Sequence, residues 1–305
     1  MRYVLLTFFF YGVVAVWAQV DTFLGVTVQN DFLDYRGHGT DRYYTGGHQV
    51  SLLFRKIGSR FTHHNVSLTQ QLYTPDNLQD TAFRALDYPY AGLLFVSYRL
   101  QHRPTASKTS WGLSSAWGYS GKRSGAGQTQ RFLHRAIGDE IPLGWNHIVE
   151  NGFFAQFQLL LEQSLLTRSK VMVTFCQTID MGTLFRRVKW GLPITVGRAS
   201  MPMGSLALFQ ERKSNLSRFS LTTFMMPTFS RVFTNRLLQW PYHRSLGYQR
   251  ALVEQLTGLE FGIQLGMGAT TLHFVQYLHQ AEFKQVGPHA FGEIAIMIPL
   301  SHNIQ

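Results

Sequence analysis

The feature that most constrains this chain is a period-two alternation of apolar and polar residues in many short segments. In the clearest one, Gly258 to Met267, every odd position is apolar and every even position is small or polar. Successive side chains of a β-strand point to opposite faces, so this segment has one apolar and one polar face. Such strands are typical of a sheet with lipid on one side and a polar interior on the other.

The same alternation recurs along the chain and predicts about 12 strands. The expected strands cover residues 22–30, 47–56, 64–73, 92–101, 109–118, 152–163, 170–180, 188–198, 218–228, 256–266, 269–281 and 290–300. An even strand number is typical of a bacterial membrane barrel, in which every backbone polar group pairs with a neighbouring strand. We therefore predict an all-β protein, a closed antiparallel transmembrane β-barrel.

The first 18 residues have the form of a secretory signal peptide. Arg2 precedes an apolar run from Tyr3 to Trp17, and the run closes on the small residue Ala18. This run is short for a membrane-spanning helix, which needs about 20 apolar residues. We expect residues 1–18 to be removed and residues 19–305 to form a single outer-membrane β-barrel.

Composition narrows the class of partner. The formal net charge of +11 favours an anionic partner such as nucleic acid or a phosphorylated lipid, although a generic basic surface gives the same charge. Export favours the lipid, so we expect no nucleic acid partner. The only cysteine is Cys176, which excludes an internal disulfide and is better explained as a packed side chain than as a nucleophile.

One segment departs from the strand pattern. Between Gln128 and Ile137 the apolar residues recur at spacings of one, three and four, which predicts a short helix in an extracellular loop. Gln130 and His134 are four residues apart and therefore share one face of that helix. Most histidines are structural or solvent-facing, but this position makes His134 a candidate general base.

Hard oxygen donors gather near the ends of the first two strands. Asn30-Asp31 ends the first, and the run Thr-Asp-Arg-Tyr-Tyr-Thr-Gly-Gly at residues 40–47 leads into the second. Amide and carboxylate oxygens are the ligands that calcium prefers, although an Asn-Asp pair at a strand end is often only a turn. Both residues can serve one site only if the strand bulges or ends at Asn30, because adjacent strand side chains point to opposite faces.

Four stretches in this order resemble the outer-membrane lipid A 3′-O-deacylases. They are Asn30-Asp31, the run at residues 40–47, Asp87-Tyr88-Pro89-Tyr90-Ala91-Gly92-Leu93, and Gln130-x-x-x-His134-x-x-Ile137-Gly138 followed by Gly144-Trp145-Asn146. The resemblance covers essentially the whole mature chain. It implies a twelve-stranded barrel whose active site lies near the outer mouth, between the barrel wall and the loop helix.

The resemblance also implies an activity, that of a calcium-dependent esterase removing ester-linked acyl chains from the lipid A of lipopolysaccharide. His134 would activate water, and Ca²⁺ held near Asn30 and Asp31 would stabilise the oxyanion. Thr45 and Gln130 would position substrate or water.

Three further predictions complete the candidate site. Glu140, just beyond the helix, is a candidate orienting partner for the catalytic histidine. Tyr88 stands where the family usually has a basic residue that could hold a lipid phosphate. Arg42 or Arg84 is therefore expected to bind that part of the substrate.

Two other functions fit the same sequence features. A passive channel or adhesin barrel would use the polar residues only to line its lumen. A barrel phospholipase would apply the same base and calcium to glycerophospholipids, but such enzymes usually use a serine nucleophile, and no serine here stands in a motif that marks one. In each case we expect a monomer among outer-membrane lipids.

Overall fold

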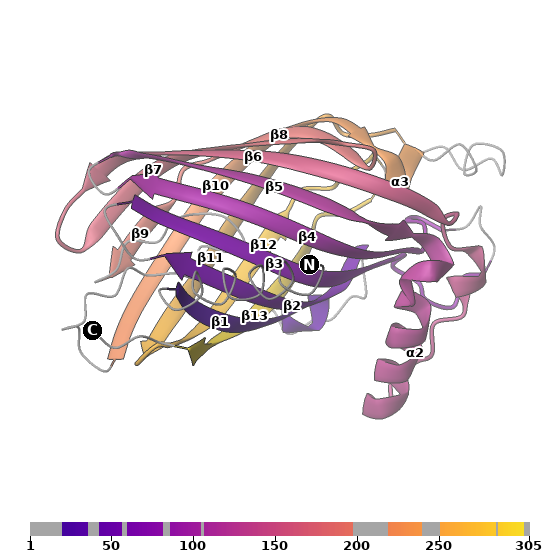
Figure 1. The fold of residues 1–305 in the computed structure, drawn as a ribbon. Helices are drawn as coiled ribbons and strands as arrows, with labels where there is room; N and C mark the ends of the chain where they lie inside the picture. Colours follow the sequence, from indigo (N-terminus) through magenta and orange to yellow (C-terminus); the bar gives the residue numbers. More distant parts are fainter. Residues whose placement is uncertain are drawn as a thin grey trace, which may run out of the picture.

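The computed structural model describes residues 20–35, 43–56, 60–81, 86–104, 107–197, 219–239, 251–284 and 286–301, and these form one antiparallel sheet closed into a barrel (Figure 1). Pairing of the last strand with the first closes it. The strands are β1 (Val20–Asn30), β2 (Tyr43–Lys56), β3 (Arg60–Thr74), β4 (Ala91–Pro104), β5 (Thr109–Ser120), β6 (Gly152–Thr167), β7 (Val171–Gly182), β8 (Phe185–Gly191), β9 (Ile194–Gly197), β10 (Phe219–Asn235), β11 (Gln255–Met267), β12 (Thr270–His279) and β13 (His289–Ser301).

The short strands β8 and β9 are two parts of one strand position. Both pair with β7 on one side and with β10 on the other. Pro193 separates them because proline has no backbone N–H to donate to a ladder. The barrel therefore has twelve strand positions, which confirms the predicted fold class, and each predicted strand segment coincides with one of them.

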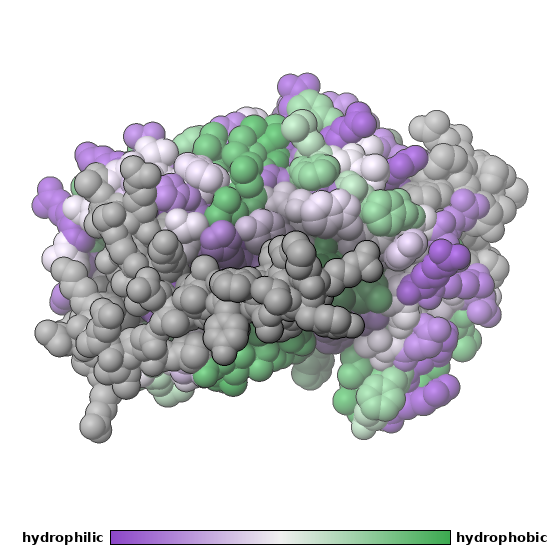
Figure 2. Space-filling view, in the orientation of Figure 1, coloured by the Kyte–Doolittle hydropathy of each residue, from purple (hydrophilic) through white to green (hydrophobic). Residues whose placement is uncertain are grey.

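The outer face of the barrel is apolar and the inner face is polar. In β11, Ile263 is 38% exposed whereas its neighbour Gln264 is 1% exposed. In β3, Val66 and Leu68 are likewise exposed while Ser67 between them is buried. Figure 2 shows hydrophobic side chains gathered in patches along the visible wall of the barrel. This division matches a wall that contacts hydrocarbon on its outside.

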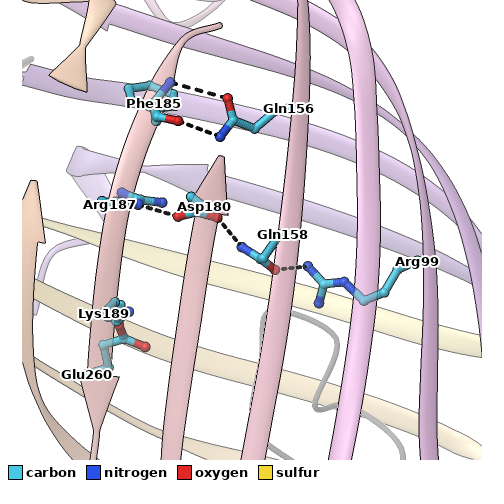
Figure 3. Close-up of polar contacts among 8 residues, drawn as sticks. All are labelled: Arg99, Gln156, Gln158, Asp180, Phe185, Arg187, Lys189 and Glu260. Carbon is cyan, nitrogen blue, oxygen red and sulfur yellow. Dashed lines mark hydrogen bonds and ion pairs between the residues drawn. The ribbon is translucent and has the colours of Figure 1, made fainter. Parts of the chain in front are cut away.

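Charged and amide side chains connect nearby strands along the inner wall of the barrel (Figure 3). Arg99 of β4 donates to Gln158 of β6 at 3.3 Å, Gln158 donates to Asp180 of β7 at 2.8 Å, and Arg187 of β8 donates to the same carboxylate at 2.5 Å. A cavity of about 340 Å³ remains beside these side chains. The polar face that the sequence predicts thus forms a hydrogen-bonded interior.

The described helices are short and lie outside the strands: η1 (Asp31–Leu33), η2 (Gly121–Ser124), α2 (Ala126–Ile137), η3 (Gly144–His147) and α3 (Arg236–Gln239). The predicted loop helix is α2. It ends at Gly138, whose φ of +75° is the left-handed conformation that glycine adopts readily, and the next backbone N–H bonds to the carbonyl of His134. Within the described ranges, no helix combines the length and the apolar character that a membrane crossing demands.

Candidate functional site

A row of paired residues that includes two glycines crosses the outer face near one end of the barrel. The strand register places Asn30 of β1 opposite Gly46 of β2, Gly46 opposite Leu72 of β3, and Leu72 opposite Gly92 of β4. Asn30 shares the outward face with Val28, which is 40% exposed. Because neighbouring strands are about 4.8 Å apart, the row spans about 14 Å. Gly46 and Gly92 have no side chains, so the barrel surface is recessed at these two positions.

A β-bulge adds Thr45 to this row. Tyr44 pairs with Tyr73 and Gly46 pairs with Leu72, so Thr45 is an extra residue between them. The hydroxyl of Thr45 hydrogen-bonds the hydroxyl of Thr74 at the end of β3, and both side chains are buried. The bulge therefore gives Thr45 a partner on the next strand that regular pairing would not give it.

The N-terminal end of α2 packs directly on this surface. A Cβ atom at Gly92 would lie 2.2 Å from Ser124 Oγ and 2.4 Å from Ala126 Cβ, so only glycine allows the close approach. Gln70 Nε2 of β3 donates to the Ser124 carbonyl at 2.7 Å. The same packing explains why Leu72, which alternation assigns to the lipid face, is only 2% exposed. In Figure 1, α2 stands outside the strands at this end of the barrel.

Gln130 on α2 is held in one orientation by Trp145. The Trp145 indole nitrogen donates to Gln130 Oε1 at 2.6 Å, and both side chains are buried. An indole N–H can only donate, so the oxygen of the amide must face it and the NH₂ group must point the other way. Gln130 Nε2 is buried and has no hydrogen-bond partner among the described residues. The amide thus presents donor hydrogens that a ligand could accept.

Trp145 is in turn fixed by close packing. A Cβ at Gly127 of α2 would lie 2.9 Å from the indole ring, and the Tyr90 ring also packs against the indole, with ring centroids 5.1 Å apart. Sequence reasoning included Trp145 in a motif but gave it no role. The signal for its position was Gly127, whose missing side chain permits the helix to pack against a large ring.

His134 lies one turn beyond Gln130 on the same buried face of α2 and is 6% exposed. Its Nδ1 atom is 2.6 Å from the main-chain carbonyl oxygen of Glu140. A carbonyl can only accept, so Nδ1 carries the hydrogen, and in the neutral ring Nε2 carries the lone pair. Asp139 Oδ2 lies 3.6 Å from the same Nδ1 atom. The ring is thereby oriented as a general base requires.

Asn30 and Asp31 lie at the junction of β1 and η1. The strand ends at Asn30, as the parity argument requires if both residues serve one site. Asn30 Oδ1 accepts from the Phe32 N–H at 2.7 Å, and Asp31 is 2% exposed. The η1 turn crosses the outside of β13, since a Cβ at Gly292 would lie 2.2 Å from the Leu33 carbonyl oxygen.

The donor chemistry at this junction fits calcium better than a softer metal. Asn30 and Asp31 offer an amide oxygen and a buried carboxylate, the hard ligands that calcium prefers. The described residues contain no group of three or more His, Cys, Asp or Glu side chains that could hold a metal. Main-chain oxygens, water or substrate would therefore complete the coordination of a calcium ion.

The remaining predicted site residues lie elsewhere. The Glu140 side chain is exposed, and its main-chain oxygen is the group that contacts His134. Tyr88 is buried on the lumen side, stacked on Tyr43 with ring centroids 5.3 Å apart, and its hydroxyl donates to Glu282 at 3.5 Å. Arg42 and Arg84 lie outside the described residues.

Comparison with known proteins identifies this architecture. A family model described as outer membrane protein LpxR matches residues 4–300. Among solved structures, the chain is similar to LpxR from Salmonella typhimurium, with a TM-score of 0.74, 17% identity, and coverage of 90% of this chain and 99% of that chain. The β domain of the Bordetella autotransporter BrkA has a TM-score of 0.45 and 7% identity, covering 92% and 98%. No curated protein sequence matches the chain.

Proposed function

Because this chain belongs to the LpxR family of outer membrane proteins and is an integral β-barrel of the outer membrane, we propose that it is a lipid A deacylase. The reaction is hydrolysis of an ester-linked acyl chain of lipopolysaccharide. The observation that carries this proposal is the pair Gln130 and His134. Hydrogen bonds to Trp145 and to the Glu140 carbonyl fix which atoms of the pair donate and which accept.

The position of the pair supports an amphiphilic substrate. Gln130 and His134 belong to a helix that packs on the outward face of β3 and β4, whereas the lumen holds a separate charged network. A lipid of the outer leaflet can approach the outer face laterally without entering the barrel. This arrangement favours a lipid-modifying enzyme over a passive channel, whose working residues would line the lumen.

Hydrolysis requires a base, a donor to the carbonyl oxygen and a returned proton. His134 Nε2 would take a proton from water as the water oxygen attacks the ester carbonyl carbon. Gln130 Nε2 would donate to the developing oxyanion or orient the attacking water. The tetrahedral intermediate then breaks its bond to the sugar-side oxygen, His134 returns the proton to that oxygen, and a fatty acid and a free hydroxyl are released.

Asn30 and Asp31 would hold the calcium ion that the resemblance implies. When bound, calcium would supply positive charge that stabilises the oxyanion. Thr45, at the bulge in β2 next to β3, would position substrate or water, as the resemblance implies. The phosphate-binding residue remains a prediction, with Arg42 and Arg84 as the candidates.

Trp145→Phe is expected to lower kcat about 3- to 10-fold, because one hydrogen bond worth about 0.5–1.5 kcal/mol fixes the Gln130 amide. Phenylalanine keeps an aromatic ring against Gly127 and Tyr90, so the helix should stay in place. The measurement is kcat for the two single variants Trp145→Phe and Gln130→Ala and for the double variant. If Trp145 acts through Gln130, the double variant should match Gln130→Ala, whereas fully additive losses would contradict this.

The proposed reaction itself is tested with purified protein in detergent micelles. We expect incubation with lipid A and calcium to release fatty acid, and incubation with glycerophospholipids to release none. Release from glycerophospholipids alone would favour the phospholipase function instead. Labelling by a covalent serine probe would contradict direct attack by water.

A further inference from the structure

The helix α2 extends away from the barrel across the direction of the strands. Figure 1 shows it reaching beyond the outline of the barrel, roughly perpendicular to the long axis. Its first residue, Ala126, is the one that packs on Gly92 of the wall, so its last residue, Ile137, lies farthest from that contact. A helix of 12 residues is about 18 Å long. Since the barrel axis crosses the membrane, α2 extends along the plane of the membrane.

The base of α2 lies at the level where the lipid-facing wall ends in aromatic rings. Tyr119 near the end of β5 and Phe153 near the start of β6 are 44% and 62% exposed, and their rings contact edge to face at 5.7 Å. The guanidinium of Arg123 in η2, directly before α2, lies 5.7 Å from the Tyr119 ring centroid. Exposed aromatic rings at a barrel end mark the boundary between hydrocarbon and headgroups. The helix is therefore continuous with the lipid-facing surface.

One side of α2 is apolar. At about 100° of rotation per residue, Phe132, Leu133, Ala136 and Ile137 fall within an arc of about 140°. Phe132 is 69% and Ile137 is 73% exposed. Exposure of large side chains at this level, next to the lipid-facing wall, is typical of an interfacial amphipathic helix.

The opposite flank of α2 is basic. Arg131 and Arg135 are four residues apart and lie on the other side of the buried Gln130 and His134 face. Arg135 is exposed and Arg131 is half-buried, and Lys122 and Arg123 in η2 are exposed. This charge complements the phosphates of anionic lipids, and the formal net charge of the chain, +11, has the same sign.

We propose that α2 is a membrane anchor that lies in the interface of the outer leaflet. Its apolar side inserts between lipid acyl chains, and Arg131 and Arg135 bind the phosphates of the same lipids. The anchor places the buried face of the helix at the depth of the ester bonds in the leaflet. This binding does not depend on the proposed hydrolysis, since it requires only an anionic bilayer.

The test places a fluorescent bimane label at three positions in full-length protein. Single cysteines replace Phe132, Ile137 or Asn77 in a Cys176→Ala background, and Asn77 serves as the control because it is exposed in the loop after β3. The proteins are reconstituted in vesicles of phosphatidylethanolamine and phosphatidylglycerol, with or without nitroxide-labelled phospholipid. We expect nitroxide lipid to cause a large loss of fluorescence at positions 132 and 137 and little loss at 77.

Equal fluorescence loss at all three positions would overturn the anchor. The anchor would also be overturned if positions 132 and 137 were protected from the nitroxide lipid only at high protein density. That result would assign the apolar side of α2 to contact with a second copy of the chain. The phosphate contacts are tested with Arg131→Gln/Arg135→Gln, which should lose less fluorescence at position 137 than the parent. Unchanged loss in that variant would remove the two arginines from the proposal.

Discussion

His134→Ala is expected to slow deacylation by about 10²–10⁴-fold, because general base catalysis contributes a factor of that size. The barrel should remain folded, since α2 lies outside the strands and the hydrogen bond from His134 Nδ1 to the Glu140 carbonyl does not join barrel strands. Such a bond contributes about 1 kcal/mol to stability. The measurement is kcat/KM on lipid A, together with the heat-modifiable migration of the folded barrel in electrophoresis.

A second variant distinguishes loss of the general base from loss of a polar side chain at this position. His134→Asn keeps a polar side chain that can donate to the Glu140 carbonyl, but its amide cannot accept a proton near neutral pH. It should therefore be as inactive as the alanine variant. Activity close to wild type in either folded variant would remove His134 from the mechanism.

Removal of calcium is expected to abolish turnover, and added calcium should restore it. The reason is the donor set: Asn30 and Asp31 offer oxygen ligands, and oxyanion stabilisation of this kind typically contributes a factor of about 10²–10³. The measurement is fatty acid release from lipid A after chelation and after titration with calcium or zinc. Restoration by zinc but not by calcium would contradict the calcium site at Asn30 and Asp31. It would indicate instead a zinc site with histidine ligands such as His48.

Asp31→Asn should raise the calcium concentration needed for half-maximal activity, because it removes the negative charge of a buried ligand. Asp34→Asn is the matched control, since Asp34 is also buried and lies just beyond η1, with its N–H donating to the Asp31 carbonyl at 3.0 Å. Calcium should also raise the unfolding temperature of the wild type more than that of Asp31→Asn. Equal behaviour of the two variants would contradict the assignment of Asp31 as a ligand.

The strands could be predicted from the sequence because period-two alternation is a local property. A residue such as Ile263 must face lipid if Gln264 faces the lumen, and no distant contact changes that. Alternation failed to predict the environment of Leu72. There a loop helix covers the outward face, and the contact depends on Gly92 and Ala126, which are distant in sequence.

The candidate site was only partly accessible to sequence reasoning. Helical spacing puts Gln130 and His134 on one face, and the structure has this arrangement. The groups that orient them could not be predicted, because one is a main-chain oxygen and the other is an indole 15 residues away. The orientation of Tyr88 could not be predicted either, because it depends on stacking against Tyr43 of β2, which is distant in sequence.

The central claim, that this barrel deacylates lipid A through His134, is tested most directly by mass spectrometry of lipid A from cells that produce it. Cells with the wild-type protein should contain lipid A that has lost the mass of a fatty acyl group, and cells with the folded His134→Ala variant should keep the parent mass. Unchanged lipid A in the presence of folded wild-type protein, or the same mass loss with the variant, would contradict the account.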